Sequence, residues 1–313
     1  MPYLQRPGYR LFYEVAGDPR RPALLLIEGM GGDVAGWHRN LSALATERFV
    51  IAHDLHGNAR SDVLDAPIAI HDLAEDAIAL MDELALTRAD VWGMSMGGLV
   101  AQEMAFRHPG RVRSLILGGS HTGGEHRVGP DGPITRLWEA IYAPAFFAAN
   151  PDHVAADRAA REGRPQAAAS RRLQRAAAHA FDGWERLPLI DVPTLVIHGT
   201  EDRVLPVENG RRLASRIPGA ELVILEGAGH AFHSERAAEV NALVLDFLRR
   251  HRSGPIDGHS ISSDSRDRHH NRRCARRHRH HLAARHSRCQ HHNRHSARRH
   301  HNRPGDIRCR RKL

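Results

Sequence analysis

Residues 89–98 read ADVWGMSMGG and contain the pattern G-x-S-x-G with Ser95 at its centre. The apolar run before Ser95 predicts a strand, and the segment Gly97–His108 after it predicts a helix. A serine between strand and helix in this pattern is typical of a nucleophile elbow. Gly93 and Gly97 fit because side chains two positions either side of so tight a turn would clash. We therefore predict Ser95 as a nucleophile and Gly93 and Gly97 as the elbow glycines.

Apolar runs alternate with amphipathic stretches along the body of the chain. Such runs are typical of strands in a parallel sheet that helices cover on both faces. The expected strands are Leu11–Ala16, Ala23–Ile27, Phe49–Ala52, Ala89–Gly93, Ser114–Gly119, Pro193–His198 and Leu222–Leu225. The expected helices flanking them cover residues 70–86, 97–108 and 234–250. The sequence therefore predicts an α/β fold with a mostly parallel central sheet.

The alternation stops between residues 120 and 190, where the chain is rich in Ala and Arg. Helical segments are expected at Ile134–Ala143 and Ala167–Phe181. We predict that residues 120–190 form a helical cap inserted over the sheet, with residues 1–119 and 191–250 as the core. The alternative is that these helices pack beside the sheet.

Three aromatic residues of the predicted cap are candidates for substrate binding. Trp138, Tyr142 and Phe146 are large and apolar, as the lining of an acyl pocket would be. The alternative is that they form the core of the cap.

A nucleophilic serine in this context needs an acid and then a histidine later in the chain. The loop after the strand PTLVIH contains Asp202, and the loop after LVIL contains His230. His230 would take the proton of Ser95, and Asp202 would hold the imidazole in the required tautomer. Glu201 is the competing acid, but it stands one residue nearer the strand. We predict a catalytic triad of Ser95, Asp202 and His230.

The oxyanion of such a reaction needs backbone N–H donors. The helix that begins at Met96 directs free N–H groups towards it, and the glycine-rich segment 28–32 follows the strand Ala23–Ile27. We therefore predict the N–H groups of Met30 and Met96 as the oxyanion hole. The alternative for the segment 28–32 is a plain glycine-rich turn.

Five motifs together resemble the α/β-hydrolase superfamily over nearly all of residues 1–250. They are LLLIEGMGG with Trp37, HDLHGNARSD, GMSMGG, HGTEDRVLP and GAGH. Their form resembles the branch of haloperoxidase-like esterases, enol-lactonases and polyketide methylesterases. The resemblance implies Met30 and Met96 as oxyanion donors and residues 120–190 as the cap. Members with an aspartate nucleophile are disfavoured because position 95 is serine.

Two motifs depart from the pattern of that family. Glu28-Gly29 stands where the family usually has His-Gly, so a carboxylate that pointed inward would disturb the oxyanion site. In the segment 54–61, His56 replaces an arginine and Ala59 replaces a glycine. We expect altered packing there and retained chemistry, since neither departure touches the predicted triad.

The last 63 residues differ in kind from the rest. Residues 251–313 hold 18 of the 45 Lys and Arg residues but only 4 of the 36 Asp and Glu residues, a net charge of +14 against −5 for residues 1–250. They also hold 13 histidines and all three cysteines. So polar a segment cannot bury enough apolar surface to fold, and we predict a disordered tail. The alternatives for its role are a metal tether and a nucleic-acid tether. The alternative for its origin is a frameshifted end of the coding region.

The sequence predicts a serine hydrolase that cleaves a carboxylic ester or lactone through an acyl-enzyme. A carbon–carbon bond hydrolase, a perhydrolase and a non-catalytic ligand-binding protein are the alternatives. No metal and no cofactor is implied. The expected partner is a small-molecule ester or lactone, and nucleic acid is not expected as a partner except through the tether alternative for the basic tail. The N-terminus has no apolar signal segment and no run of about 18 apolar residues exists, so we expect no membrane association and a cytoplasmic location.

Overall fold

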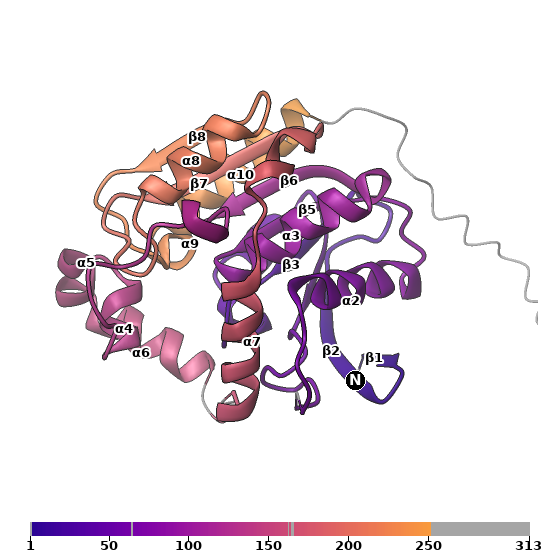
Figure 1. Cartoon of the computed structure of the whole chain (residues 1–313), viewed down its shortest axis with the longest axis horizontal. Coiled ribbons are helices and arrows are strands. Elements are labelled where there is room, and N and C mark those ends of the chain that lie inside the picture. The colour runs from indigo at the N-terminus through magenta and orange to yellow at the C-terminus, as the bar shows by residue number, and fades with distance from the viewer. Residues whose placement is uncertain (1, 64, 162, 164–165, 252–313) are drawn as a thin grey trace, which may run out of the picture. The chain divides into compact units, whose positions relative to one another are not determined.

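The computed structural model describes residues 2–63, 65–161, 163 and 166–251. An eight-stranded sheet lies at the centre of this part of the chain (Figure 1). Its strands are β1 (Tyr3–Arg6), β2 (Tyr9–Ala16), β3 (Ala23–Ile27), β4 (Phe49–His53), β5 (Ala89–Met94), β6 (Val112–Gly118), β7 (Thr194–Gly199) and β8 (Glu221–Leu225).

The strand order is β1-β2-β4-β3-β5-β6-β7-β8. β1 and β2 are antiparallel to each other and β2 is antiparallel to β4, while all other neighbours are parallel. The predicted fold, an α/β-hydrolase fold with a mostly parallel sheet, is confirmed. β1 was not predicted, because its four residues YLQR lack a continuous apolar run.

Helices cover both faces of the sheet, because successive side chains of each buried strand point to opposite faces. Leu25 and Ile27 of β3 join a core with α2 (Ile70–Glu83), α3 (Met96–Arg107) and α8 (Glu208–Arg216). Leu24 and Leu26 join a second core with the 3₁₀ helix η1 (Val34–Trp37), α1 (Leu41–Leu44), α9 (Phe232–Glu235) and α10 (Ala237–Arg250). Trp37 is fully buried in this second core, against Trp92.

The predicted helix over residues 234–250 is two helices, α9 and α10. They are separated at Arg236, which has φ −125° and ψ 43°. The predicted helix over residues 70–86 ends earlier, at Glu83, and Ala85 then takes a positive φ of 54°. In the second case Leu84 and Leu86 continue the apolar spacing past the end of the helix.

Among the described residues, four α-helices lie between β6 and β7, inside the segment that we propose as the cap, and the short 3₁₀ helices η3 (Gly124–His126) and η4 (Trp184–Leu189) flank them. The four α-helices are α4 (Leu137–Ile141), α5 (Pro144–Ala149), α6 (Pro151–Ala160) and α7 (Ala168–Ala180). Figure 1 shows α4, α5 and α6 grouped together, with α7 next to them. The amide of Gln174 on α7 donates to the carbonyl oxygen of His56 at 2.8 Å and to Asn58 Oδ1 at 3.0 Å, so α7 is tied to the loop after β4.

The predicted disorder of residues 251–313 concerns a segment that lies, except for His251, outside the described residues. Within the described ranges, no helix combines the length and the apolar character needed to cross a membrane.

Candidate active site

Ser95 stands on the turn from β5 to α3 in a strained backbone conformation, with φ 53° and ψ −119°. Non-glycine residues rarely adopt such a φ, and they keep it only where the surroundings enforce it. The Ser95 N–H donates to the carbonyl oxygen of Gly118 at 2.8 Å, and its own carbonyl oxygen accepts from Ser120 Oγ at 2.9 Å. A Cβ on Gly93 would collide with backbone atoms of Gly97, so the turn needs glycine there.

The loop after β3 passes directly against Ser95. A Cβ on Gly29 would lie 2.9 Å from Ser95 Cβ and 3.4 Å from its Oγ, so only glycine lets the loop approach this closely. Met30 on this loop and Met96 at the start of α3 line the same cavity as Ser95. Their backbone N–H groups are therefore candidates for the oxyanion hole.

Asp202 and His230 are brought together from two loops, one after β7 and the other after β8. His230 Nδ1 lies 2.7 Å from Asp202 Oδ2. The other oxygen, Oδ1, accepts the N–H groups of Val204 at 2.9 Å and Leu205 at 2.8 Å. These three contacts fix the carboxylate. Glu201, the competing acid, is exposed to solvent.

Asp202 and His230 each favour the charged form of the other. Burial opposes ionisation of Asp202, but His230 and His198 outweigh it and hold the pKa of that carboxyl well below its ordinary value. Burial likewise lowers the pKa of His230, but the Asp202 carboxylate more than offsets it, and the pKa of His230 ends above its ordinary value. The imidazole is thus poised to accept a proton.

His198, which the sequence did not single out, is a third member of this cluster. It is fully buried at the end of β7, with Nε2 3.3 Å from Asp202 Oδ2 and 2.8 Å from the carbonyl oxygen of Leu205. The sequence signal that could have identified His198 is a histidine near the end of an otherwise apolar strand. His198 holds the same carboxylate oxygen that contacts His230.

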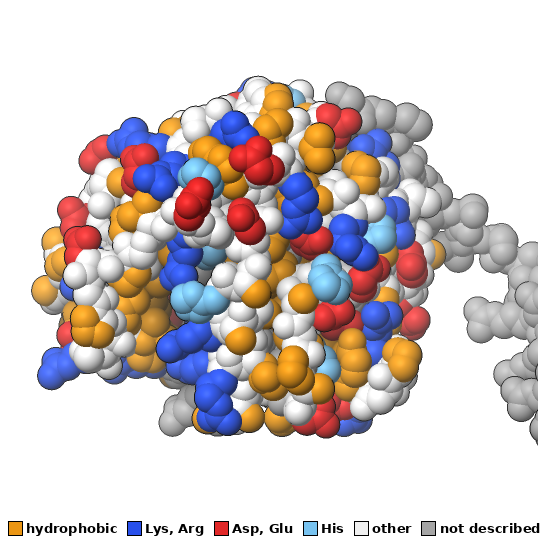
Figure 2. All heavy atoms as spheres, in the orientation of Figure 1, with side chains coloured by type: hydrophobic (Ala, Val, Ile, Leu, Met, Phe, Trp, Pro, Cys, Tyr) orange, Lys and Arg blue, Asp and Glu red, His pale blue; other side chains and the backbone are white. Residues whose placement is uncertain are grey.

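Ser95 and His230 share a cavity of about 560 Å³. One wall is apolar and includes Pro133, Ile134, Leu137 and Ile141. The lining also includes a set of basic or histidine side chains, namely His121, Arg127, Arg161, Arg171, Arg175 and His179. Figure 2 shows a hollow with hydrophobic side chains in it and Lys or Arg and His side chains along one edge.

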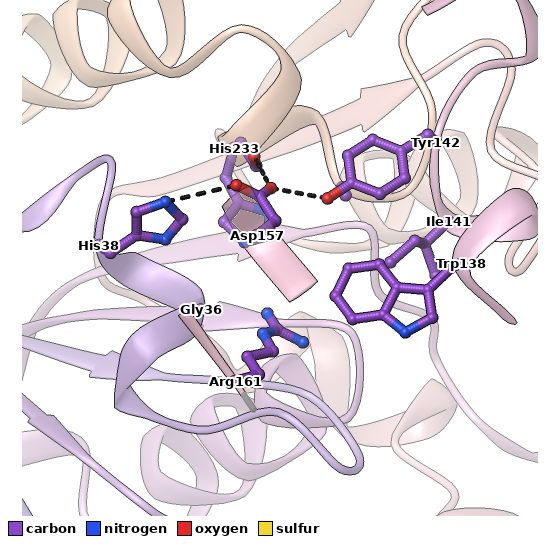
Figure 3. Close-up of a pocket in the computed structure, with 10 residues that line it drawn as sticks. Gly36, His38, Trp138, Ile141, Tyr142, Asp157, Arg161 and His233 are labelled. Atoms are coloured by element: carbon purple, nitrogen blue, oxygen red, sulfur yellow. Dashed lines mark hydrogen bonds and ion pairs between the residues drawn. The ribbon is translucent and has the colours of Figure 1, made fainter. Parts of the chain in front are cut away.

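The three aromatic candidates do not lie around this cavity. Trp138 and Tyr142 line a second, smaller pocket, and the Tyr142 hydroxyl donates to Asp157 Oδ2 at 2.6 Å (Figure 3). Phe146 stacks on Tyr142, with ring centroids 5.9 Å apart. These rings pack within the proposed cap because a polar partner for the Tyr142 hydroxyl lies inside it. The cavity at Ser95 instead uses aliphatic side chains of the segment 133–141.

Glu28, the first departure from the family pattern, is held in an ion pair. Its Oε1 lies 2.8 Å from Arg161 Nη2, and its Oε2 accepts the N–H of Gly29 at 3.0 Å. The pKa of His233 beside it, 3.9 Å from the carboxylate, is lowered by burial to about 4, so that imidazole is neutral. Both carboxylate oxygens are engaged, and the charge of Glu28 is shared with Arg161.

The second departure lies in the loop after β4 and packs as an ordered turn. His56 stacks on the ring of Tyr9, with centroids 3.8 Å apart. Ala59 takes φ 42°, in the left-handed region where the family's glycine would be unstrained. Asp54 binds both the N–H of Val34 at 2.8 Å and the guanidinium of Arg60 at 3.0 Å, and it holds the loop despite this strain.

The described residues contain no group of three or more His, Cys, Asp or Glu side chains that could hold a metal ion. The histidines and cysteines of residues 252–313 lie outside the described part.

Comparison with known proteins defines the class. A model of the alpha/beta hydrolase family matches residues 24–243, and the chain belongs to this family. It is 34% identical to a protein of Variovorax paradoxus (strain S110) that carries the name "Putative carbamate hydrolase RutD", over 77% of this chain and 96% of that protein. Among solved structures it is similar to the enol-lactonase from Burkholderia xenovorans LB400, with TM-score 0.71 and 28% identity, over 79% of this chain and 100% of that one. It is also similar to a hydrolase from Pseudomonas aeruginosa PA01, with TM-score 0.71 and 27% identity, over 79% of this chain and 97% of that one.

Proposed function

We propose that this protein is a serine hydrolase that cleaves a carboxylic ester or lactone through an acyl-enzyme. One observation carries the proposal: Ser95, on its strained turn, and His230, bonded to Asp202, border one cavity. A nucleophile, a base and an orienting acid in this chain order are what acyl transfer requires.

The reaction follows from which imidazole nitrogen is free. Nδ1 of His230 is held by Asp202, so Nε2 takes the proton as Ser95 Oγ attacks the carbonyl carbon. The carbonyl oxygen becomes an oxyanion, which the N–H groups of Met30 and Met96 stabilise. His230 then returns the proton to the departing alkoxide. A water molecule attacks the acyl-Ser95 ester by the same path and releases the acid.

The proposed roles of the other residues follow from this path. Gly93 and Gly97 permit the turn that exposes Ser95. Carbamates have the same attackable carbonyl carbon, and the similarity to a protein named for carbamate hydrolysis makes them the second candidate substrate class. Carbon–carbon bond hydrolysis and perhydrolysis use the same triad and remain alternatives.

A fluorophosphonate probe and a substrate panel test the proposal. The panel contains p-nitrophenyl esters, lactones and carbamates, and wild-type protein is compared with Ser95→Ala. We expect covalent labelling at Ser95, turnover of an ester or lactone by the wild type, and loss of both in the variant. Labelling of another serine, or no turnover of any member by a folded protein, would contradict it. A carbamate hydrolysed in preference to every ester would move the assignment to the second class.

A further inference from the structure

The cavity at Ser95 holds more positive charge than its own residues neutralise. Among the described residues that line it, Glu28 is the sole carboxylate, and it is paired with Arg161. No carboxylate of the described chain lies within 4.0 Å of the guanidinium groups of Arg127, Arg171 or Arg175. Three cationic side chains thus face one cavity without an anionic partner.

Helix α7 presents two of these arginines as a stripe. Arg171, Arg175 and His179 stand at positions i, i+4 and i+8, so they lie above one another on the face that borders the cavity. The sequence of α7, AASRRLQRAAAHA, has no Asp or Glu to relieve the repulsion between like charges at this spacing. An anion bound along the stripe would relieve it.

Arg127 approaches this stripe from the loop after β6. Its Nη1 lies 3.4 Å from Nδ1 of His179, and its Nε is buried and has no hydrogen-bond partner among the described residues. Burial lowers the pKa of Arg127, as expected for a cation withdrawn from water. A buried, unpaired guanidinium N–H is a donor that a ligand can satisfy.

His121 adds a neutral donor to the same wall. Burial, together with the nearby charges of Arg127 and His179, lowers the pKa of His121 to about 3. Its Nδ1 accepts the N–H of Gly123 at 3.0 Å. The neutral ring therefore carries its proton on Nε2, where it can donate to an acceptor in the cavity.

The stripe begins beside the reacting groups. Arg171 Nη2 lies 3.5 Å from the position that a Cβ on Gly31 would occupy, and Gly31 follows Met30 of the oxyanion loop. The same cavity is also lined by the apolar side chains of Ile134, Leu137 and Ile141. The cavity thus offers a basic edge for an anionic group and an apolar wall for the chain that joins it to the scissile carbonyl (Figure 2).

We propose that the substrate carries a carboxylate in addition to its ester or lactone, and that Arg127, Arg171 and Arg175 bind this carboxylate. This inference rests on the proposed hydrolase function. Guanidinium groups match carboxylates in charge and geometry, and pairs of this kind form strong charge-assisted hydrogen bonds. A neutral substrate would leave all three cations unpaired in the complex.

Half-esters and diesters of the same dicarboxylic acids test the inference. Monomethyl and dimethyl esters of the acids from succinate to pimelate differ only in the free carboxylate. We expect kcat/KM of the best half-ester to exceed that of its diester by about tenfold, which corresponds to about 1.4 kcal/mol. This preference should shrink as salt approaches about 1 M, where the screening length is about 3 Å.

Substitutions on α7 test whether the preference for half-esters over diesters depends on Arg171 and Arg175. Arg171→Gln and Arg175→Gln should each lower the ratio of half-ester to diester kcat/KM severalfold, mainly through KM of the half-ester. Arg172→Gln is the matched control, because Arg172 lies on the same helix and is exposed, as Arg171 and Arg175 are, but does not line the cavity. An equal effect of Arg172→Gln, or no preference for any half-ester, would overturn the inference.

Binding to the Ser95→Ala variant separates this inference from the proposed function. Calorimetry measures the affinity of that variant for each half-ester and diester without turnover. Tighter binding of half-esters with no hydrolysis by the wild type would support the carboxylate site and overturn the hydrolase proposal. Hydrolysis of both ester types with equal binding would support the hydrolase and overturn the carboxylate site.

Discussion

Glu28 and Arg161 form an ion pair at 2.8 Å that joins the loop after β3 to the residue that follows α6. The Glu28 side chain is 8% exposed and that of Arg161 is 26% exposed, so the pair is only partly screened by water. The carboxylate also acts on His230, where its negative charge favours the protonated imidazole. Through this charge, a residue outside the proposed triad influences its base.

Glu28→Gln should therefore change the pH profile of hydrolysis. The substitution removes a negative charge that favours the protonated imidazole, so the pKa of His230 should fall. Since the base must be neutral to accept the proton of Ser95, the acid limb of kcat/KM should move to lower pH. Glu201→Gln is the control, because Glu201 is exposed. An unchanged limb, or one displaced to higher pH, would show that Glu28 does not act on His230.

Ser95→Ala should abolish hydrolysis and leave the fold intact. Loss of a nucleophile of this kind lowers kcat by roughly 10⁴ to 10⁶. The thermal midpoint should stay near that of the wild type, because alanine meets the same backbone strain at φ 53°. Activity on the best substrate and a melting curve check both statements. Residual activity close to the wild-type level would remove Ser95 from the mechanism.

Asp202→Asn should lower kcat by about 10⁴. The asparagine oxygen can still accept from Val204 and Leu205, but the amide would then face Nδ1 of His230 and stabilise the wrong tautomer. Glu201→Gln should have almost no effect on kcat. A reversed ranking of the two variants would transfer the acid role to Glu201.

Gly97→Ala should prevent correct folding, because the added Cβ would collide with the carbonyl oxygen of Ile27 in β3. Backbone cannot move aside as a flexible side chain can. Gly110→Ala is the matched control, since nothing lies within 4 Å of its added Cβ, and it should be neutral or raise stability by up to about 1 kcal/mol. Soluble yield and chemical denaturation measure the difference. Equal stability of the two variants would mean that β3 and α3 can separate.

A chain that ends after Arg252 should keep its turnover and its thermal midpoint. Helix α10 already buries Val240, Val244 and Leu248, and Glu221 contacts both Arg250 and His251. The truncated protein should lose retention on heparin, because the net charge of +14 belongs to residues 251–313. Loss of activity on truncation would mean that the removed segment contributes to the catalytic unit.

Local patterns in the sequence predicted much of the sheet and the turn at Ser95. The strands β3, β5 and β7 are mostly apolar and buried along their whole length, and their ends carry the segments with Glu28, Ser95 and Asp202. Asp202 was preferred over Glu201 from its distance to the strand, and the structure bonds Asp202 to His230. These features depend on short stretches of chain, which sequence patterns describe well.

The lining of the cavity was not predicted, because it depends on how the helices after β6 face the sheet. Aromatic character suggested Trp138, Tyr142 and Phe146, but the hydroxyl of Tyr142 has its partner inside the helical segment. Arg171 and Arg175 look like a solvated helix face in the sequence alone. Helix α7 has no acidic residue, so it offers these arginines no partner within the helix.

The pairing of β6 with β7 has a consequence for how the protein folds. Gly118 lies beside Ile197 in the sheet, and all of α4 to α7 intervenes between the two strands. Pairing at such sequence separation closes a long loop and is slow compared with the formation of local helices. On a ribosome, the first six strands emerge before β7 and β8. Asp202 follows β7 and His230 follows β8, so both residues of the proposed triad emerge after the first six strands. Recovery of hydrolase activity during refolding should therefore report the last strands joining the sheet, and it should lag behind the recovery of helical signal.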